Sequence, residues 1–132
     1  MTQARETTHR ALKRLLVNGP LIGVPARPGD QALLLHLAAA RFEAQKAYRE
    51  SEVNEMLKSW LQSFCAPFGI DHVTMRRLMV DSGLLSRDKA GSMYRINPKR
   101  TGDLDTDQAI EPAQVLAEIQ SEREARKRRR AT

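Results

Sequence analysis

Apolar residues recur every three or four positions in four separate stretches of the chain, and this spacing is typical of amphipathic helices. The stretches cover residues 3–17, 30–42, 50–64 (starting at Glu50 or Ser51) and 71–82. Asp30 and Asp71 each stand at the start of a stretch, where an aspartate side chain accepts hydrogen bonds from unpaired backbone N–H groups. We therefore expect both aspartates to cap helices. The second stretch places its apolar face on Leu34, Leu35, Ala38 and Phe42.

A β-hairpin is predicted directly after the fourth helix. Gly83 suits the left-handed backbone that commonly ends a helix. The runs LLSR and SMYRI then flank the turn DKAG, which contains Gly91. Tyr94 and Ile96 alternate along the second run, so they form its apolar face. A short extended piece is also expected at Tyr48.

Segments rich in proline, glycine or polar residues separate the central part of the chain from two flanks. Residues 18–29 and 97–106 are predicted linkers, while a narrow apolar stripe over 110–124 predicts a C-terminal helix. The expected parts are an N-terminal helical arm and linker (1–29), a winged-helix domain (30–97), and a linker, C-terminal helix and basic tail (98–132).

Within the central part, the predicted order of elements is three helices followed by a hairpin. The expected fold class is mainly α with a small β-hairpin, a winged helix-turn-helix with flanking N- and C-terminal helices. In such folds the second helix of the turn-connected pair lies in the major groove of DNA. Here that recognition helix is the one over residues 71–82.

The charge distribution changes this picture in one respect. The formal net charge of +6 and the sequence pI of about 10.0 favour polyanionic partners. Residues 28–97, however, hold nine Lys/Arg against eight Asp/Glu, whereas residues 1–27 hold five against one. The excess therefore lies mainly in the N-terminal arm, and the basic residues of the C-terminal part cluster near its end.

Cysteine usage and apolar content indicate a reducing compartment. Cys65 is the only cysteine, so no internal disulfide can form. The basic N-terminal segment lacks the uninterrupted apolar core of a signal peptide. No stretch approaches the ~20 apolar residues that cross a bilayer. We expect a cytoplasmic protein with no membrane partner.

Catalytic and metal chemistry find little support in the residues that usually carry them. Cys65, His36, His72 and Asp71 do not follow a zinc-ligand spacing. No glycine-rich loop that would cradle a phosphate is present. We therefore expect no enzyme activity, no metal and no cofactor.

Four short motifs lie between Asp30 and Ile96. They contain Tyr48, Glu50, Glu52, Val53 and Asn54, then Arg76, Arg77, Val80 and Asp81, then Gly83, Leu85 and Arg87, then Gly91 and Tyr94. In these motifs the chain resembles the bacterial domain-of-unknown-function 2087 family. The resemblance implies a winged-helix-like fold and a link to transcriptional regulators, but no defined activity. Arg49 replaces the Thr or Ser that precedes the helix in that family, so Ser51 is an alternative cap.

Two adjacent arginines in the predicted recognition helix, Arg76 and Arg77, are the main candidates for nucleic-acid contact. We expect both to project from its outer half, because Met75 and Leu78 turn inward. A guanidinium group there can pair with phosphates or with guanine edges. An alternative partner for Arg77 is Asp81, four residues further on. His72 and Thr74 lie in the first turn and are further candidates, although His72 also suits an exposed position beside the cap.

Basic residues of the hairpin and the tail complete the candidate set. Arg87, Lys89 and Arg95 would contact phosphates as a wing, or would keep an edge hairpin from aggregating. The tail run would clamp a phosphate backbone, or would form a disordered solubilising end. It consists of Arg126, Lys127, Arg128, Arg129 and Arg130.

The leading hypothesis from these patterns is a DNA-binding protein, either a transcriptional regulator or an accessory nucleic-acid-binding protein. Its expected partner is double-stranded DNA. The alternative is a protein–protein interaction module that uses the same scaffold without binding DNA, which the nearly neutral central part favours. The apolar stripes of the flanking helices would also suit a homodimer interface.

Overall fold

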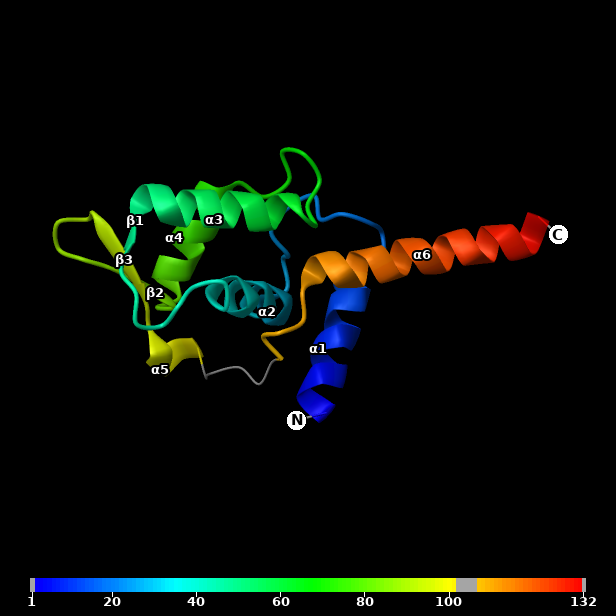
Figure 1. Cartoon of the computed structure of the whole chain (residues 1–132), viewed down its shortest axis with the longest axis horizontal. Helices are drawn as coiled ribbons and strands as arrows, with labels where there is room; N and C mark the ends of the chain where they lie inside the picture. The colour runs from blue at the N-terminus through cyan, green and yellow to red at the C-terminus, as the bar shows by residue number, and fades with distance from the viewer. Residues whose placement is uncertain (1, 102–106, 132) are drawn as a thin grey trace.

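The computed structural model describes residues 2–101 and 107–131 (Figure 1). In chain order its elements are α1 (Thr2–Leu15), α2 (Pro28–Ala39), β1 (Tyr48–Arg49), α3 (Glu50–Gln62), α4 (His72–Asp81), β2 (Leu85–Arg87), β3 (Met93–Ile96), α5 (Pro98–Thr101) and α6 (Pro112–Ala131). The three strands lie at one end of the molecule, and α1 and α6 lie at the other.

The strands form one small antiparallel sheet in the order β1-β3-β2. Tyr94 in the central strand pairs with Tyr48 on one side and with Arg87 on the other. The series α2-β1-α3-α4-β2-β3 is therefore a winged-helix-like arrangement, and the predicted mainly α fold class is confirmed. The extended piece expected at Tyr48 is a third strand of the sheet rather than an isolated segment.

Helix α2 lies in the middle of the molecule, and its C-terminal part is buried on all sides. Residues 33–39 are all buried, so the single apolar face predicted for this helix was too narrow. Even His36 is buried, and its two ring nitrogens lie 2.8 Å from the Ala32 carbonyl oxygen and 3.3 Å from that of Arg100. A helix surrounded by protein has no polar face for a periodic pattern to reveal.

One predicted helix start and one alternative cap are wrong. α2 begins at Pro28 rather than at an Asp30 cap, because the fixed φ of proline suits the first helical position. Asp30 instead lies 3.5 Å from the guanidinium group of Arg14. α3 begins at Glu50, the first of its two expected starts, so the alternative cap Ser51 lies inside the helix. The Arg49 N–H donates to the Glu52 carboxylate at 3.0 Å.

The two flanking helices pack on the central part and on each other. Leu12 of α1 and Leu16, just after this helix, are buried in the same core as Val115 and Ile119 of α6. At the surface, Lys13 contacts Glu122 at 2.8 Å. The apolar stripes that were expected to suit a homodimer are thus buried within one chain.

The predicted C-terminal tail is also different from expectation. Arg126–Arg130 continue helix α6, so the expected disordered end is wrong. Residues 98–101 of the predicted linker form the short helix α5, and residues 102–106 lie outside the described part. Within the described residues, no helix is both long enough and apolar enough to cross a bilayer.

Candidate nucleic-acid interface

Helix α4 is fixed in place from its inner side. Met75 and Met79 are completely buried, and the helix packs against α2, α3 and β2. Gly83 follows with a φ of 82°, the left-handed conformation that glycine adopts at low cost, so the prediction for this position is confirmed. The opposite face of α4 is exposed at Thr74 and Arg77.

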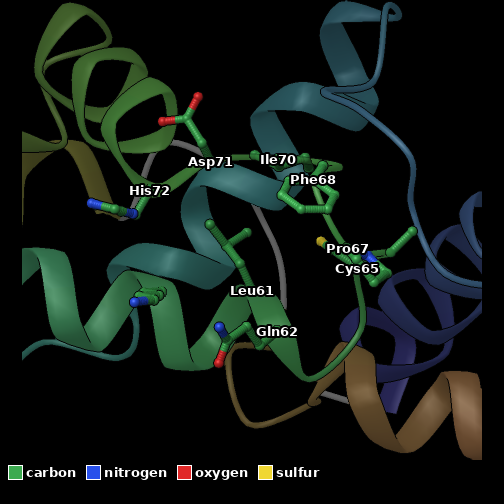
Figure 2. A pocket seen from close by; sticks show the side chains of 10 residues that line it. Leu61, Gln62, Cys65, Pro67, Phe68, Ile70, Asp71 and His72 are labelled. Atoms are coloured by element: carbon green, nitrogen blue, oxygen red, sulfur yellow. The ribbon is translucent and has the colours of Figure 1, made fainter.

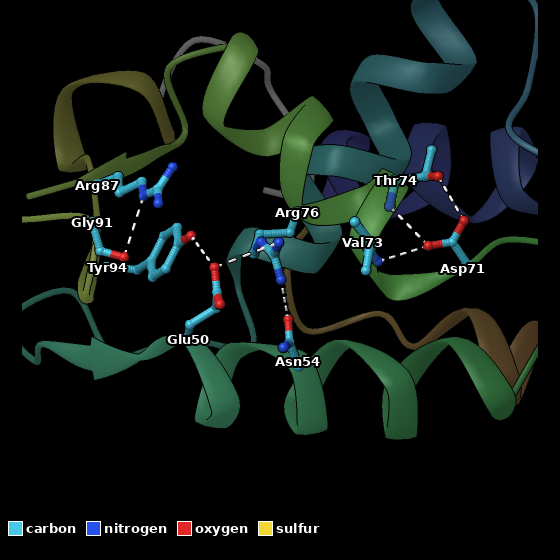
Figure 3. A network of polar contacts seen from close by, with 9 residues as sticks. All are labelled: Glu50, Asn54, Asp71, Val73, Thr74, Arg76, Arg87, Gly91 and Tyr94. Atoms are coloured by element: carbon cyan, nitrogen blue, oxygen red, sulfur yellow. Dashed lines mark hydrogen bonds and ion pairs between the residues drawn. The ribbon is translucent and has the colours of Figure 1, made fainter.

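The predicted cap at Asp71 is confirmed. Its Oδ1 accepts hydrogen bonds from the N–H groups of Val73 at 2.8 Å and Thr74 at 3.0 Å, and its Oδ2 accepts the Thr74 hydroxyl at 2.7 Å (Figure 3). These bonds, that of the Thr74 hydroxyl foremost, hold the pKa of Asp71 below its usual value of 3.8. The hydroxyl of Thr74 is thus already engaged, which limits it as a contact to bases.

Arg76 does not project outward, and that prediction is wrong. Only 13% of its side chain is exposed, and the guanidinium group lies between α3, α4 and β3 (Figure 3). It donates to the amide oxygen of Asn54, lies 3.5 Å from the carboxylate of Glu50 and sits 6.0 Å from the centre of the Tyr94 ring. The Tyr94 hydroxyl donates to the same Glu50 oxygen at 2.9 Å, which closes the network.

Arg77 is the arginine that α4 presents to solvent. It is exposed, and in the described part of the chain its side chain has neither a hydrogen bond nor an ion pair, so the predicted pair with Asp81 does not form. A guanidinium group without a protein partner keeps all five donors for a ligand. Of the two arginines, only Arg77 therefore remains a candidate contact residue.

The hairpin has three basic residues in different states. Arg87 folds back on its own turn, where its Nε donates to the Gly91 carbonyl oxygen at 3.3 Å. The Asp88 carboxylate caps the turn by accepting hydrogen bonds from the N–H groups of Ser92 and Met93. These bonds lower the pKa of Asp88, and the bond from Met93 has the largest effect. Lys89 and Arg95 are exposed. The wing therefore presents Lys89 and Arg95 directly to a ligand, whereas Arg87 is available only if its side chain leaves the Gly91 carbonyl oxygen.

A hollow of about 460 Å³ lies beside the turn between α3 and α4 (Figure 2). It brings together Cys65, His72 and Asp71, three of the four residues considered above for catalysis. Burial raises the pKa of the Cys65 thiol to about 11, so the thiol is protonated at neutral pH, unlike an activated nucleophile. Among the described residues, no three His, Cys, Asp or Glu side chains lie together in a way that could hold a metal ion.

Comparison with known families decides the classification. Residues 20–96 match a family described as "Uncharacterized protein conserved in bacteria (DUF2087)". The chain belongs to this family. The matched segment starts ten residues before the predicted Asp30 boundary and leaves out α1 and α6. Neither the curated proteins nor the solved structures contain a match to the chain.

The structure gives the DUF2087 motifs a physical role. Glu50 and Asn54 come from the first motif, Arg76 from the second and Tyr94 from the fourth, and all four meet in the single network of Figure 3. Sequence reasoning missed Glu50, Asn54 and Tyr94 as partners of Arg76. The only signal was the presence of all four residues in the motifs, because helical spacing does not reveal a contact between segments 22 residues apart.

The candidate residues fall into two groups. His72, Thr74, Arg77 and the wing surround the exposed face of α4, whereas Arg126–Arg130 lie on α6 at the other end of the molecule (Figure 1). His72 is half-buried and borders the hollow next to the turn. The structure therefore does not bring the tail and the recognition helix together.

Proposed function

We propose that this protein binds double-stranded DNA through the outer face of α4 and the wing, as a cytoplasmic transcriptional regulator or accessory nucleic-acid-binding protein. The observation that carries the proposal is the unpaired, exposed Arg77 on a capped and anchored α4, beside a wing with exposed Lys89 and Arg95. In helix-turn-helix proteins the equivalent helix enters the major groove and the neighbouring segments contact the backbone.

The proposal gives different tasks to the basic residues. Arg77 reaches a guanine edge or a phosphate with its two parallel donors. Lys89 and Arg95 contact phosphates beside the groove, which adds affinity without sequence preference. Arg76 acts as a positioning residue, because its donors are directed to Asn54 and Glu50 and hold α4 at a fixed angle to α3.

A protein-interaction module is the second candidate function, and one observation favours it. Phe68 is fully exposed, with a positive φ of 63°, and it borders the hollow beside the turn (Figure 2). Ile22 is 84% exposed and follows Leu21, which forms an isolated β-bridge with Cys65 in the same turn region. Exposed large apolar side chains that lie near each other are common at protein-binding surfaces.

Fluorescence anisotropy with a labelled random-sequence duplex, at two salt concentrations, separates the two candidates. The test variant is Arg77→Ala/Lys89→Ala, and the matched control is Arg5→Ala/Arg10→Ala, which removes the same charge from exposed positions on α1. We expect the test variant to lose about two phosphate contacts, so that its log–log salt slope falls by roughly 2 and its affinity by about tenfold or more.

The control variant should bind almost as well as the natural protein. Equal loss in both variants would mean that net charge alone drives binding, and the assigned surface would then be wrong. No binding by the natural protein at low salt would favour the protein-interaction function instead.

A further inference from the structure

The C-terminal half of α6 leaves the body of the protein. The side chains of this helix that enter the core end at Ile119, and residues 120–131 are exposed apart from the half-buried Ala125. Figure 1 shows this half extending past α1. It contains no apolar side chain larger than alanine, so it buries little against the rest of the chain.

Positive charge is concentrated on this exposed half. Residues 123–130 hold six Lys/Arg and one Glu. Because a helix has 3.6 residues per turn, four of the six share one face, and they line a shallow hollow of about 160 Å³. The four are Arg123, Arg126, Lys127 and Arg130.

Part of this face is already committed within the chain. Arg123 donates to the carbonyl oxygen of Val17, and Arg126 lies 4.0 Å from the carboxylate of Glu122. Lys127 and Arg130 have no polar partner in the described part of the chain. These two residues are therefore the ones most available to an external ligand.

The helix dipole explains only some of this charge. Cations are favourable in the last turn of a helix, where the carbonyl ends carry partial negative charge. Like charges four residues apart repel, however, as Arg123 and Lys127 do here, and Arg126 and Arg130 as well. A helical segment that buries nothing is also marginal in water. An anionic partner would offset both costs.

The distribution of charge favours nucleic acid as that partner. A helix that lies in a membrane interface needs an apolar face, and residues 120–131 have none. Cations also occupy more than one side of the helix, since Arg128 and Arg129 fall away from the face of Lys127. This arrangement fits a groove with phosphates along both walls, as in a nucleic-acid duplex.

We propose that residues 123–130 of α6 form a second duplex-binding element, separate from α4 and the wing. The two elements lie at opposite ends of the molecule (Figure 1), so one chain holds two duplex segments at once. The binding by α6 stands on its own, whereas the bridging of two duplexes rests on the proposed function of α4.

A bead-retention assay with the full chain tests this proposal. One duplex is immobilised, a second labelled duplex is added with the protein, and the retained label is measured. We expect Lys127→Ala/Arg130→Ala to lower retention by about tenfold while Arg5→Ala/Arg10→Ala leaves it unchanged. Alanine preserves helicity, which circular dichroism checks.

Single-duplex anisotropy distinguishes a failure of this proposal from a failure of the proposed function. If both hold, the α6 variant and the Arg77→Ala/Lys89→Ala variant each still bind one duplex, through the element that the substitutions leave intact, and neither variant bridges two duplexes. If only the α6 variant loses binding, the second element is supported and the function assigned to α4 fails.

Two outcomes would overturn the second element. One is a Lys127→Ala/Arg130→Ala variant that binds and bridges like the natural chain. Bridging would then not need α6, for example because a dimer holds two duplexes through its two α4 helices. The other is stronger binding to vesicles of anionic phospholipid than to duplex at equal phosphate concentration. The quantity compared is the binding that the natural chain shows and the Lys127→Ala/Arg130→Ala variant loses.

Discussion

At the scale of single residues, the start of α4 depends on Asp71. One oxygen of its carboxylate accepts two backbone N–H groups and the other accepts the Thr74 hydroxyl. These bonds favour the ionised form, and they lower the pKa of Asp71 from 3.8. The helix proposed to contact DNA is therefore held at its first turn by a charged cap.

Replacing this cap should weaken the fold in a pH-dependent way. We expect Asp71→Ala to lower the free energy of unfolding by about 1 kcal/mol at pH 7. Because the folded pKa is depressed, the stabilisation by the carboxylate is complete above its ordinary pKa and is lost as the pH falls through the folded value. Urea unfolding at several pH values measures this, and Asp71→Asn is the control that keeps an acceptor oxygen but has no titration. A stability difference between the natural protein and the Asp71→Asn variant that does not shrink in acid would contradict the assignment.

At the scale of elements, adjacent arginines on α4 differ in what they hold together. Arg76 joins α4 to α3 through Asn54 and Glu50, whereas Arg77 faces solvent. We expect Arg76→Ala to cost about 1–3 kcal/mol, because it leaves partly buried polar groups without a partner. Arg77→Ala should change stability by less than about 0.5 kcal/mol, as at other exposed sites.

Thermal unfolding and duplex binding of the two single variants test this contrast. Arg77→Ala should weaken binding without changing the melting temperature. Arg76→Ala should lower the melting temperature. Below that temperature it should weaken duplex binding only to the extent that the loss of its contacts moves α4 relative to α3. If the Arg76→Ala variant is as stable as the natural protein but no longer binds duplex, Arg76 itself contacts the DNA and its assignment as a positioning residue is wrong.

Local signals explain which elements the sequence could predict. The cap at Asp71 and the left-handed glycines at 83 and 91 are properties of a few neighbouring residues, and α4 and the hairpin were predicted with their main features. β1 has only two residues, so periodicity cannot reveal its pairing with β3. The position of Arg76 depends on Asn54, 22 residues away, and helical spacing alone cannot register that contact.

At the scale of the whole molecule, the core extends beyond the segment that matches the family. Residues 20–96 carry the match, yet Leu12 of α1 and Leu116 of α6 are buried in the common core. Glu111, just before α6, accepts from the Trp60 indole at 3.4 Å and pairs with Arg41 of the segment after α2. These contacts join both flanks to the winged helix.

We therefore expect the flanks and the winged helix to unfold as one unit. Leu12→Ala should lower the free energy of unfolding by about 2–5 kcal/mol, because Leu12 has no exposed surface and its loss leaves a cavity. Trp60, the only tryptophan, lies inside the matched segment, so its fluorescence reports on the winged helix while the substitution lies outside it.

The decisive comparison is between two probes of the same denaturation. If the chain is one cooperative unit, Leu12→Ala shifts the Trp60 fluorescence transition and the helical circular dichroism transition by the same amount. Ile22→Ala is the matched control, since Ile22 is 84% exposed and its truncation should cost less than about 0.5 kcal/mol. An unchanged Trp60 transition with an early loss of helicity would show instead that α1 and α6 form a separate unit. In that case the second duplex-binding element on α6 would be tethered to the winged helix rather than held at a fixed distance from it, and bridging would depend little on the geometry of the two duplexes.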